Sequence, residues 1–145
     1  MPEQETVERA QEDAREGKSA ATQAGEFVRE EMHHVREGKH GARSPQQAIA
    51  IGLSKARRSG VKLRAPKGPA SLRKKAEQDT KAGKTRRHKP SAQRSRTISG
   101  VLKRESKASA SRQAIFRQTK RSAAKRGKHA RSAAAIKAVR TRKAA

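Results

Sequence analysis

The feature that most constrains this chain is its shortage of large apolar side chains. Leucine, isoleucine, valine and phenylalanine together supply 17 of the 145 residues, and Trp and Tyr are absent. Highly charged chains with less than about 20% of the four large types tend toward disorder. Most of the other hydrophobic residues are alanine, which favours helix but buries little surface. The sequence therefore predicts an all-α fold with a small local core, partly disordered when free.

Charge is strongly segregated along the chain. Residues 1–37 contain 10 acidic and 5 basic side chains, a net charge of −5. Residues 38–145 contain 3 acidic and 33 basic side chains, a net charge of +30, and the two values sum to the overall +25. Such asymmetry is typical of chains that bind nucleic acid or another anionic surface.

Residues 22–60 have the periodicity of a helical hairpin. In its first helix, from about residue 23 to 37, Thr22 is the expected N-cap and Gly38 the stop signal. Apolar residues recur on one face of each helix at i, i+4 and i+7. The residues that we expect to form the hairpin core are Val28, Met32, Val35, Ile49 and Leu53.

The second helix of the hairpin has a strong start signal. Ser44 is the expected N-cap, and Pro45 takes the first helical position, where its missing N–H costs nothing. Gln47, three residues after the cap, completes a capping box. Gly60 follows the last turn and ends the helix.

The other segments are assigned by composition. Residues 1–21 are an acidic N-terminal segment with a short helix, and residues 61–89 are a basic linker with another. Residues 90–145 are a basic tail rich in Ala, Lys and Arg, expected to form several helices with Ser91 as one N-cap and Gly127 as one stop.

The hairpin contains the run Gln-Ala-Ile-Ala-Ile-x-Leu-Ser-x-Ala-Arg after a Gly-Lys-His-Gly turn. With these residues, the stretch 27–60 resembles a small bacterial family of uncharacterised domains. The resemblance implies a compact helical module and no established activity. In composition, the basic remainder resembles the tails of linker-histone-like bacterial proteins. The matching residues in the hairpin are Met32, Gly38, Lys39, Gln47, Ala48, Ile49, Ala50, Ile51, Leu53, Ser54, Ala56 and Arg57.

The density of cations indicates a polyanion partner. It exceeds what solubility requires, and release of counterions from phosphates drives binding without sequence readout. Because the cations are spread over several segments, we expect the chain to wrap a nucleic-acid backbone. The expected contact residues are Lys55, Arg57, Arg58, Arg73, Lys74, Lys75, Lys84, Arg86, Arg87, Lys89, Arg94, Arg96, Lys103, Arg104, Lys120, Arg121, Lys125, Arg126, Lys128, Arg140, Arg142 and Lys143.

DNA is favoured over RNA because readers of RNA and single strands use aromatic stacking platforms. The chain has two phenylalanines, Phe27 and Phe116, and we expect both to pack against helices. The first hypothesis is therefore a nucleoid-associated, histone-like protein of the bacterial cytoplasm. The alternatives are a protein-interaction or self-association module centred on residues 22–60, and a basic protein associated with RNA or ribosomes.

Other classes find little support in the sequence. With no cysteine and no apolar run of about 18 residues, thiolate sites and membrane spans are not expected. A metal site is not expected. Five side chains could converge near the turn, but their spacing matches neither the H-E-x-x-H motif nor a Cys/His motif: Glu30, His33, His34, Glu37 and His40. No phosphate-binding Gly-rich loop or catalytic constellation occurs, so neither a cofactor nor enzymatic activity is expected.

Overall fold

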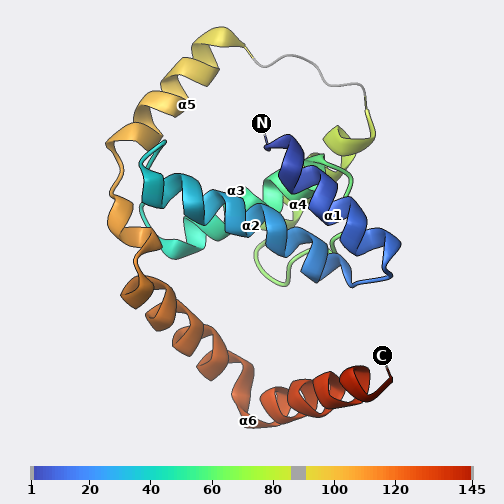
Figure 1. Cartoon of the computed structure of the whole chain (residues 1–145). Coiled ribbons are helices and arrows are strands. Elements are labelled where there is room, and N and C mark those ends of the chain that lie inside the picture. The colour runs from blue at the N-terminus through green and yellow to red at the C-terminus, as the bar shows by residue number, and fades with distance from the viewer. Residues whose placement is uncertain (1, 86–90, 145) are drawn as a thin grey trace. The chain divides into compact units, whose positions relative to one another are not determined.

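The structure, a computed structural model, describes residues 2–85 and 91–144, and these residues are all-α (Figure 1). The predicted fold class is confirmed. The chain divides into two compact units, residues 1–110 and 111–145. The helices are α1 (Gln4–Arg15), α2 (Ala20–Glu37), α3 (Pro45–Arg58), α4 (Ala70–Lys84), α5 (Ala92–Arg104), the 3-10 helix η1 (Lys107–Ala110) and α6 (Arg112–Ala144).

Helix α2 starts three residues earlier than its sequence predicts. Ser19, not Thr22, is the N-cap, and its Oγ accepts the backbone N–H of Thr22 at 3.2 Å. The predicted cap is therefore the donor in the actual capping bond. The predicted stop is in place, because Gly38 adopts a left-handed conformation with φ 80° that favours glycine.

Helix α3 is capped as predicted, with one change. Ser44 Oγ accepts the backbone N–H of Gln47 at 3.2 Å, and Pro45 occupies the first turn. The Gln47 side chain accepts the backbone N–H of Arg43 at 2.8 Å, one residue before the cap. Two backbone donors at the start of the helix thus have side-chain acceptors.

Helices α2 and α3 approach each other closely at Gly52. A Cβ atom placed on Gly52 would lie 2.7 Å from Val28 Cα and 3.0 Å from the carbonyl oxygen of Phe27. Only glycine allows the two backbones to come so near. This contact sets the packing distance of the pair.

The core between the helices is small and rich in alanine. Phe27, Val35, Ala24, Ala48 and Ala56 are completely buried. The close approach of the helices explains why small side chains fill the interface.

Of the five predicted core residues, Met32 and Val35 are buried. Val28, Ile49 and Leu53 are only half-buried. They lie at the margin of the interface that alanine fills, so the periodicity located the correct helix faces but not the residues deepest in the core.

Helix α1 packs on the hairpin instead of standing apart from it (Figure 1). Thr6 and Ala10 are buried, and Val7 lies against the cluster that contains Phe27 and Ala56. The sequence predicted an acidic N-terminal segment with a short helix over residues 1–21, and in the structure the apolar stripe of this helix is covered by α2.

Residues near the end of α5 also dock on the hairpin. The backbone N–H groups of Gly41 and Ala42 donate to the carbonyl oxygens of Leu102 at 2.8 Å and Ser106 at 3.1 Å. Arg36 Nε donates to the carbonyl oxygen of Ala110 at 3.0 Å. The basic tail proposed for residues 90–145 is therefore divided, with its first 21 residues in the first unit. Backbone hydrogen bonds of this kind leave no side-chain pattern in the sequence.

The second unit is the single element α6, interrupted at Gly127. Gly127 has φ 73° and ψ 165°, so the helix breaks at the residue that was predicted to stop it. No residue of 112–143 is buried. Three of its large apolar side chains are more than half exposed: Phe116, Ile136 and Val139.

None of the helices in the described part of the chain is long and apolar enough to cross a lipid bilayer.

The close approach at Gly52 predicts opposite effects for two glycine-to-alanine substitutions. Gly52→Ala should destabilise the chain by about 1–3 kcal/mol, because the new methyl group collides with the backbone of α2. Gly25→Ala, in open space on α2, should stabilise it by up to about 1 kcal/mol through helix propensity. Urea unfolding followed by circular dichroism measures both. Equal effects of the two substitutions would contradict the proposed packing.

Candidate nucleic-acid interface

The predicted contact residues fall into two groups according to what their side chains touch. Four of them are engaged inside the first unit: Lys55, Arg57, Arg58 and Lys75. Another 15 are exposed and have no ion pair among the described residues, and Arg86, Arg87 and Lys89 lie outside the described residues. The two groups have different roles.

Asp79 of α4 holds two of the predicted contact residues. Its side chain is 3% exposed and receives Arg58 Nη2 at 2.8 Å and Lys75 Nζ at 2.8 Å. Ser54 Oγ donates to the same carboxylate at 2.7 Å. Burial alone would raise the pKa of Asp79, but hydrogen bonds from Lys75, Ser54 and Arg58 outweigh it and hold the pKa below its usual value. This cluster fastens α4 to α3.

Lys55 of α3 occupies a second internal cluster. Its Nζ lies 2.9 Å from Glu30 Oε1 and 2.7 Å from Glu31 Oε2, and both carboxylates are about 1% exposed. Burial works against the charged ammonium, yet hydrogen bonds to Glu30 and Glu31 raise the pKa of Lys55 above its usual value. Burial likewise opposes the charged form of Glu30, but the hydrogen bond from Lys55 lowers its pKa.

Arg57 is buried, with 9% of its surface exposed. Its Nη2 donates to the carbonyl oxygen of Arg64 at 3.4 Å, which ties α3 to the segment that follows. Together with Lys55, Arg58 and Lys75, it stabilises the first unit, although Arg58 and Lys75 keep about half of their side chains exposed.

The exposed group has no ion-pair partner among the described residues. Cations on the surface without a carboxylate nearby are those that a phosphate backbone can reach. On α6, Lys120 also lies over the ring of Phe116, 5.0 Å from its centroid. The 15 residues are Arg73, Lys74, Lys84, Arg94, Arg96, Lys103, Arg104, Lys120, Arg121, Lys125, Arg126, Lys128, Arg140, Arg142 and Lys143.

The prediction based on clusters of cations missed several single cations. Arg112, Arg117, Arg131 and Lys137 are all exposed on α6. With them, residues 111–145 contain 12 Lys and Arg and no Asp or Glu. The signal that could have identified them is the absence of acids, not the clustering of bases.

Most of the acidic side chains lie in residues 1–37. Arg9, Arg15, Lys18 and Arg29 each pair with carboxylates of α1, α2 or the turn between them. Among the three acids after residue 38, Asp79 is buried and Glu105 pairs with Arg43 at 3.5 Å. The exposed charged side chains of α4, α5 and α6 are thus cationic, with Glu77 as the exception.

The histidines of the hairpin are arranged differently from the expectation. His34 and His40 lie near the carboxylate of Glu31, which was not among the residues expected to converge there. His33 is exposed on the neighbouring position of α2. The signal in the sequence was the i, i+3 spacing of Glu31 and His34, which puts both on one helix face.

No known family, curated protein or solved structure matches this chain. The case for its function therefore depends on the residues and their geometry.

Removing the Asp79 carboxylate should destabilise the fold in a pH-dependent way. We expect Asp79→Asn to cost about 1–3 kcal/mol near neutral pH, because Arg58 and Lys75 lose a charged acceptor. Since the folded pKa of Asp79 lies below its unfolded value of about 3.9, its contribution is complete above that pH and is lost as pH falls through the folded pKa. The difference in free energy of unfolding between the two proteins should therefore shrink in acid.

Glu77→Gln is the matched control for this prediction. Glu77 is exposed on the same helix and its replacement changes the net charge equally. It should alter stability by less than about 0.5 kcal/mol. Urea unfolding at neutral pH and near pH 3 distinguishes the variants, and a loss for Asp79→Asn that is the same at both pH values would contradict the assigned pKa shift.

Proposed function

We propose that this protein binds nucleic acid without sequence specificity, and duplex DNA in preference to RNA, by neutralising backbone phosphates. The observation that carries the proposal is the C-terminal unit, in which 12 cations and no acids lie on a helical segment without buried residues. Exposed cations of α4 and α5 would neutralise phosphates in the same way. The corresponding biological role is that of a nucleoid-associated, histone-like protein of the bacterial cytoplasm.

The distribution of charge around α6 favours wrapping over docking in a single orientation. In the first half of the helix, like charges recur four residues apart, as in Arg117, Arg121 and Lys125. Such spacing destabilises an isolated helix, and α6 has no buried face to compensate. A polyanion removes the repulsion, so binding and helix formation support each other.

The preference for duplex DNA is supported by the few aromatic side chains. Phe27 is completely buried and cannot stack on a base. Phe116 is 58% exposed, contrary to the expectation that it packs against a helix. One exposed ring under a lysine does not provide the series of platforms that single-strand readers use.

The alternative of a protein-interaction module centred on residues 22–60 has less apolar surface available. Met32 and Val35 are buried, and α1 and α4 cover the hairpin. The apolar side chains that remain exposed lie outside it, on α4, α5 and α6: Leu72, Ile98, Val101, Phe116, Ile136 and Val139. Self-association through the hairpin is therefore the second hypothesis.

Salt dependence tests the proposal directly. The full chain should bind a labelled DNA duplex of about 30 base pairs with log affinity that falls linearly and steeply with log salt, with no preference among sequences. A matched RNA duplex should bind no more tightly. Flat salt dependence, or no binding near physiological salt, would reject nucleic acid as the partner and favour a protein partner.

A pair of charge variants locates the interface. Replacing Lys120, Arg121, Lys125 and Arg126 by Gln should weaken binding and reduce the salt slope by about 0.9 for each phosphate that is no longer neutralised. Replacing Arg9, Arg15, Lys18 and Arg29 by Gln removes the same net charge from ion-paired positions and should change the slope far less. If the two variants behave alike, overall charge and not α6 determines binding.

Helicity should increase when DNA is added. Phosphates relieve the like-charge repulsion along α6, so the helical signal in circular dichroism should increase with DNA until saturation. Inorganic polyphosphate should give a similar gain, because base edges are not read. A gain with DNA but none with polyphosphate would contradict backbone neutralisation as the mechanism.

A further inference from the structure

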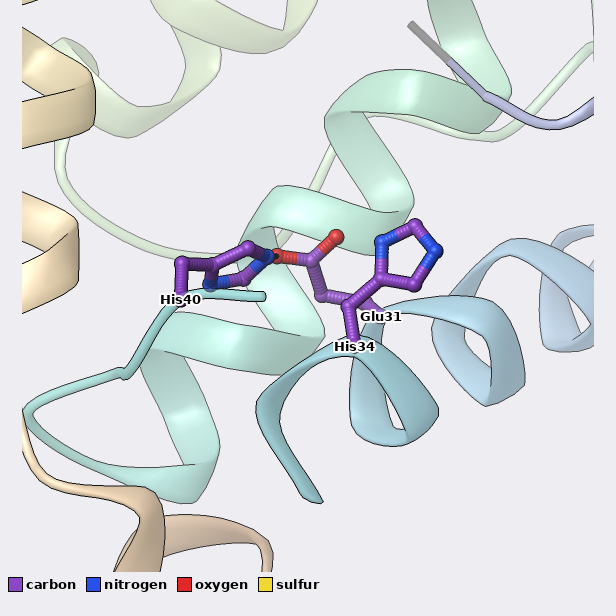
Figure 2. A group of neighbouring side chains, drawn as sticks. All are labelled: Glu31, His34 and His40. Carbon is purple, nitrogen blue, oxygen red and sulfur yellow. Dashed lines mark ion pairs between the residues drawn. The ribbon is translucent and has the colours of Figure 1, made fainter. Parts of the chain in front are cut away.

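A group of three side chains gathers at the C-terminal end of α2. Glu31 and His34 project from the helix, and His40 reaches them from the turn that follows (Figure 2). One ligand atom from each residue lies within 4.8 Å of the others. Glu31 is completely buried, while His34 and His40 are 12% and 18% exposed.

The hydrogen bond of His40 fixes which of its nitrogens can bind. His40 Nδ1 lies 3.0 Å from the carbonyl oxygen of Gly41, which can only accept, so Nδ1 carries the hydrogen. In the neutral ring, Nε2 then holds a lone pair. That nitrogen faces Glu31 Oε1 at 3.2 Å. Two lone pairs at this distance require a proton or a metal ion between them.

His34 is oriented in the same manner. Its Nε2 lies 2.9 Å from Glu3 Oε1, a carboxylate that accepts the ring N–H. Its other ring nitrogen, Nδ1, lies 3.9 Å from Glu30 Oε1, and Figure 2 shows that one ring nitrogen is on the side of the Glu31 carboxylate and the other is turned away. Histidine ligands of metals commonly donate their second N–H to a carboxylate or a backbone carbonyl, and both arrangements occur here.

The buried carboxylate of Glu31 is engaged at only one of its oxygens. In the part of the chain that the structure describes, Oε1 accepts no hydrogen bond. Lys55 Nζ lies 2.7 Å from Oε2, but the same ammonium also serves Glu30 at 2.9 Å. Two buried carboxylates share one lysine, which leaves one negative charge without a full partner.

We propose that Glu31, His34 and His40 form a binding site for a divalent transition-metal ion, with Zn²⁺ as the best fit. Two imidazole nitrogens and one carboxylate oxygen form a ligand set that zinc accepts, with water as a fourth ligand. Ligand atoms around tetrahedral zinc lie about 3.3 Å apart, from bond lengths of about 2.0–2.1 Å. The separation of His40 Nε2 and Glu31 Oε1, 3.2 Å, already meets this requirement.

The ion would have a structural role. Only His34 has to move closer to complete the site, and Lys55 remains paired with Glu30. Glu31 and His34 belong to α2, whereas His40 belongs to the turn before α3. Metal binding would therefore join the end of α2 to this turn. The site uses none of the exposed cations of α6 and does not depend on the proposed nucleic-acid binding.

The test is a zinc titration of the full chain, free of nucleic acid, by isothermal calorimetry near neutral pH. We expect one Zn²⁺ per chain and a higher melting temperature that a chelator reverses. Co²⁺ in place of zinc should give the intense visible bands of a tetrahedral site. These measurements need no variant. A folded wild-type chain that binds no Zn²⁺ would overturn the proposal and leave a proton between His40 and Glu31.

Variants assign the ligands. His34→Ala and His40→Ala should each weaken zinc binding by more than about tenfold, because even the loss of a group that only orients a metal ligand costs about 10–100-fold. His33→Ala is the matched control, since His33 is the exposed neighbour of His34 on α2 and should leave affinity unchanged. Equal losses in all three variants, or no loss in the first two, would show that the bound ion is not held by this cluster.

Discussion

The contact between α2 and α3 at Gly52 is the constraint on which the first unit depends. Because glycine lets the two backbones meet, alanine and one phenylalanine can fill an interface that a chain with few large apolar residues could not otherwise close. Helix α1 then covers Phe27, α4 covers the outer face of α3, and η1 docks on the same pair. Because the core is small, a substitution that disturbs its packing should destabilise the whole unit.

The carboxylates divide the cations of this chain into structural and available ones. Glu30, Glu31 and Asp79 are buried, and each holds cations from another element or from its own helix. The acids of α1 and α2 neutralise the cations near them. Beyond residue 105 no acid occurs, so the cations there have no internal competitor for a phosphate. Stability and the proposed binding are therefore carried by different parts of one basic sequence.

The turn between α2 and α3 connects several of these features. Gly41 and Ala42 bind the end of α5 and the residue before η1 through backbone hydrogen bonds, and His40 points back to Glu31. An ion held by Glu31, His34 and His40 would stiffen the turn that anchors this docking. The proposed metal site would thus stabilise the folded unit through residues that are not among the expected nucleic-acid contacts.

The sequence by itself determined the fold class, the start of α3, the stops at Gly38 and Gly127, and the surplus of cations, since all depend on local preferences or on composition. It could not determine that α1 covers the hairpin, that residues 102–110 join it, or that Lys55, Arg58 and Lys75 are committed to buried carboxylates. It also could not indicate that His40 meets Glu31 and His34. These outcomes depend on contacts between residues distant in the chain. The sequence does not distinguish a lysine or arginine that is paired inside the fold from one that is exposed to solvent. Only the tertiary structure decides which carboxylate lies beside it.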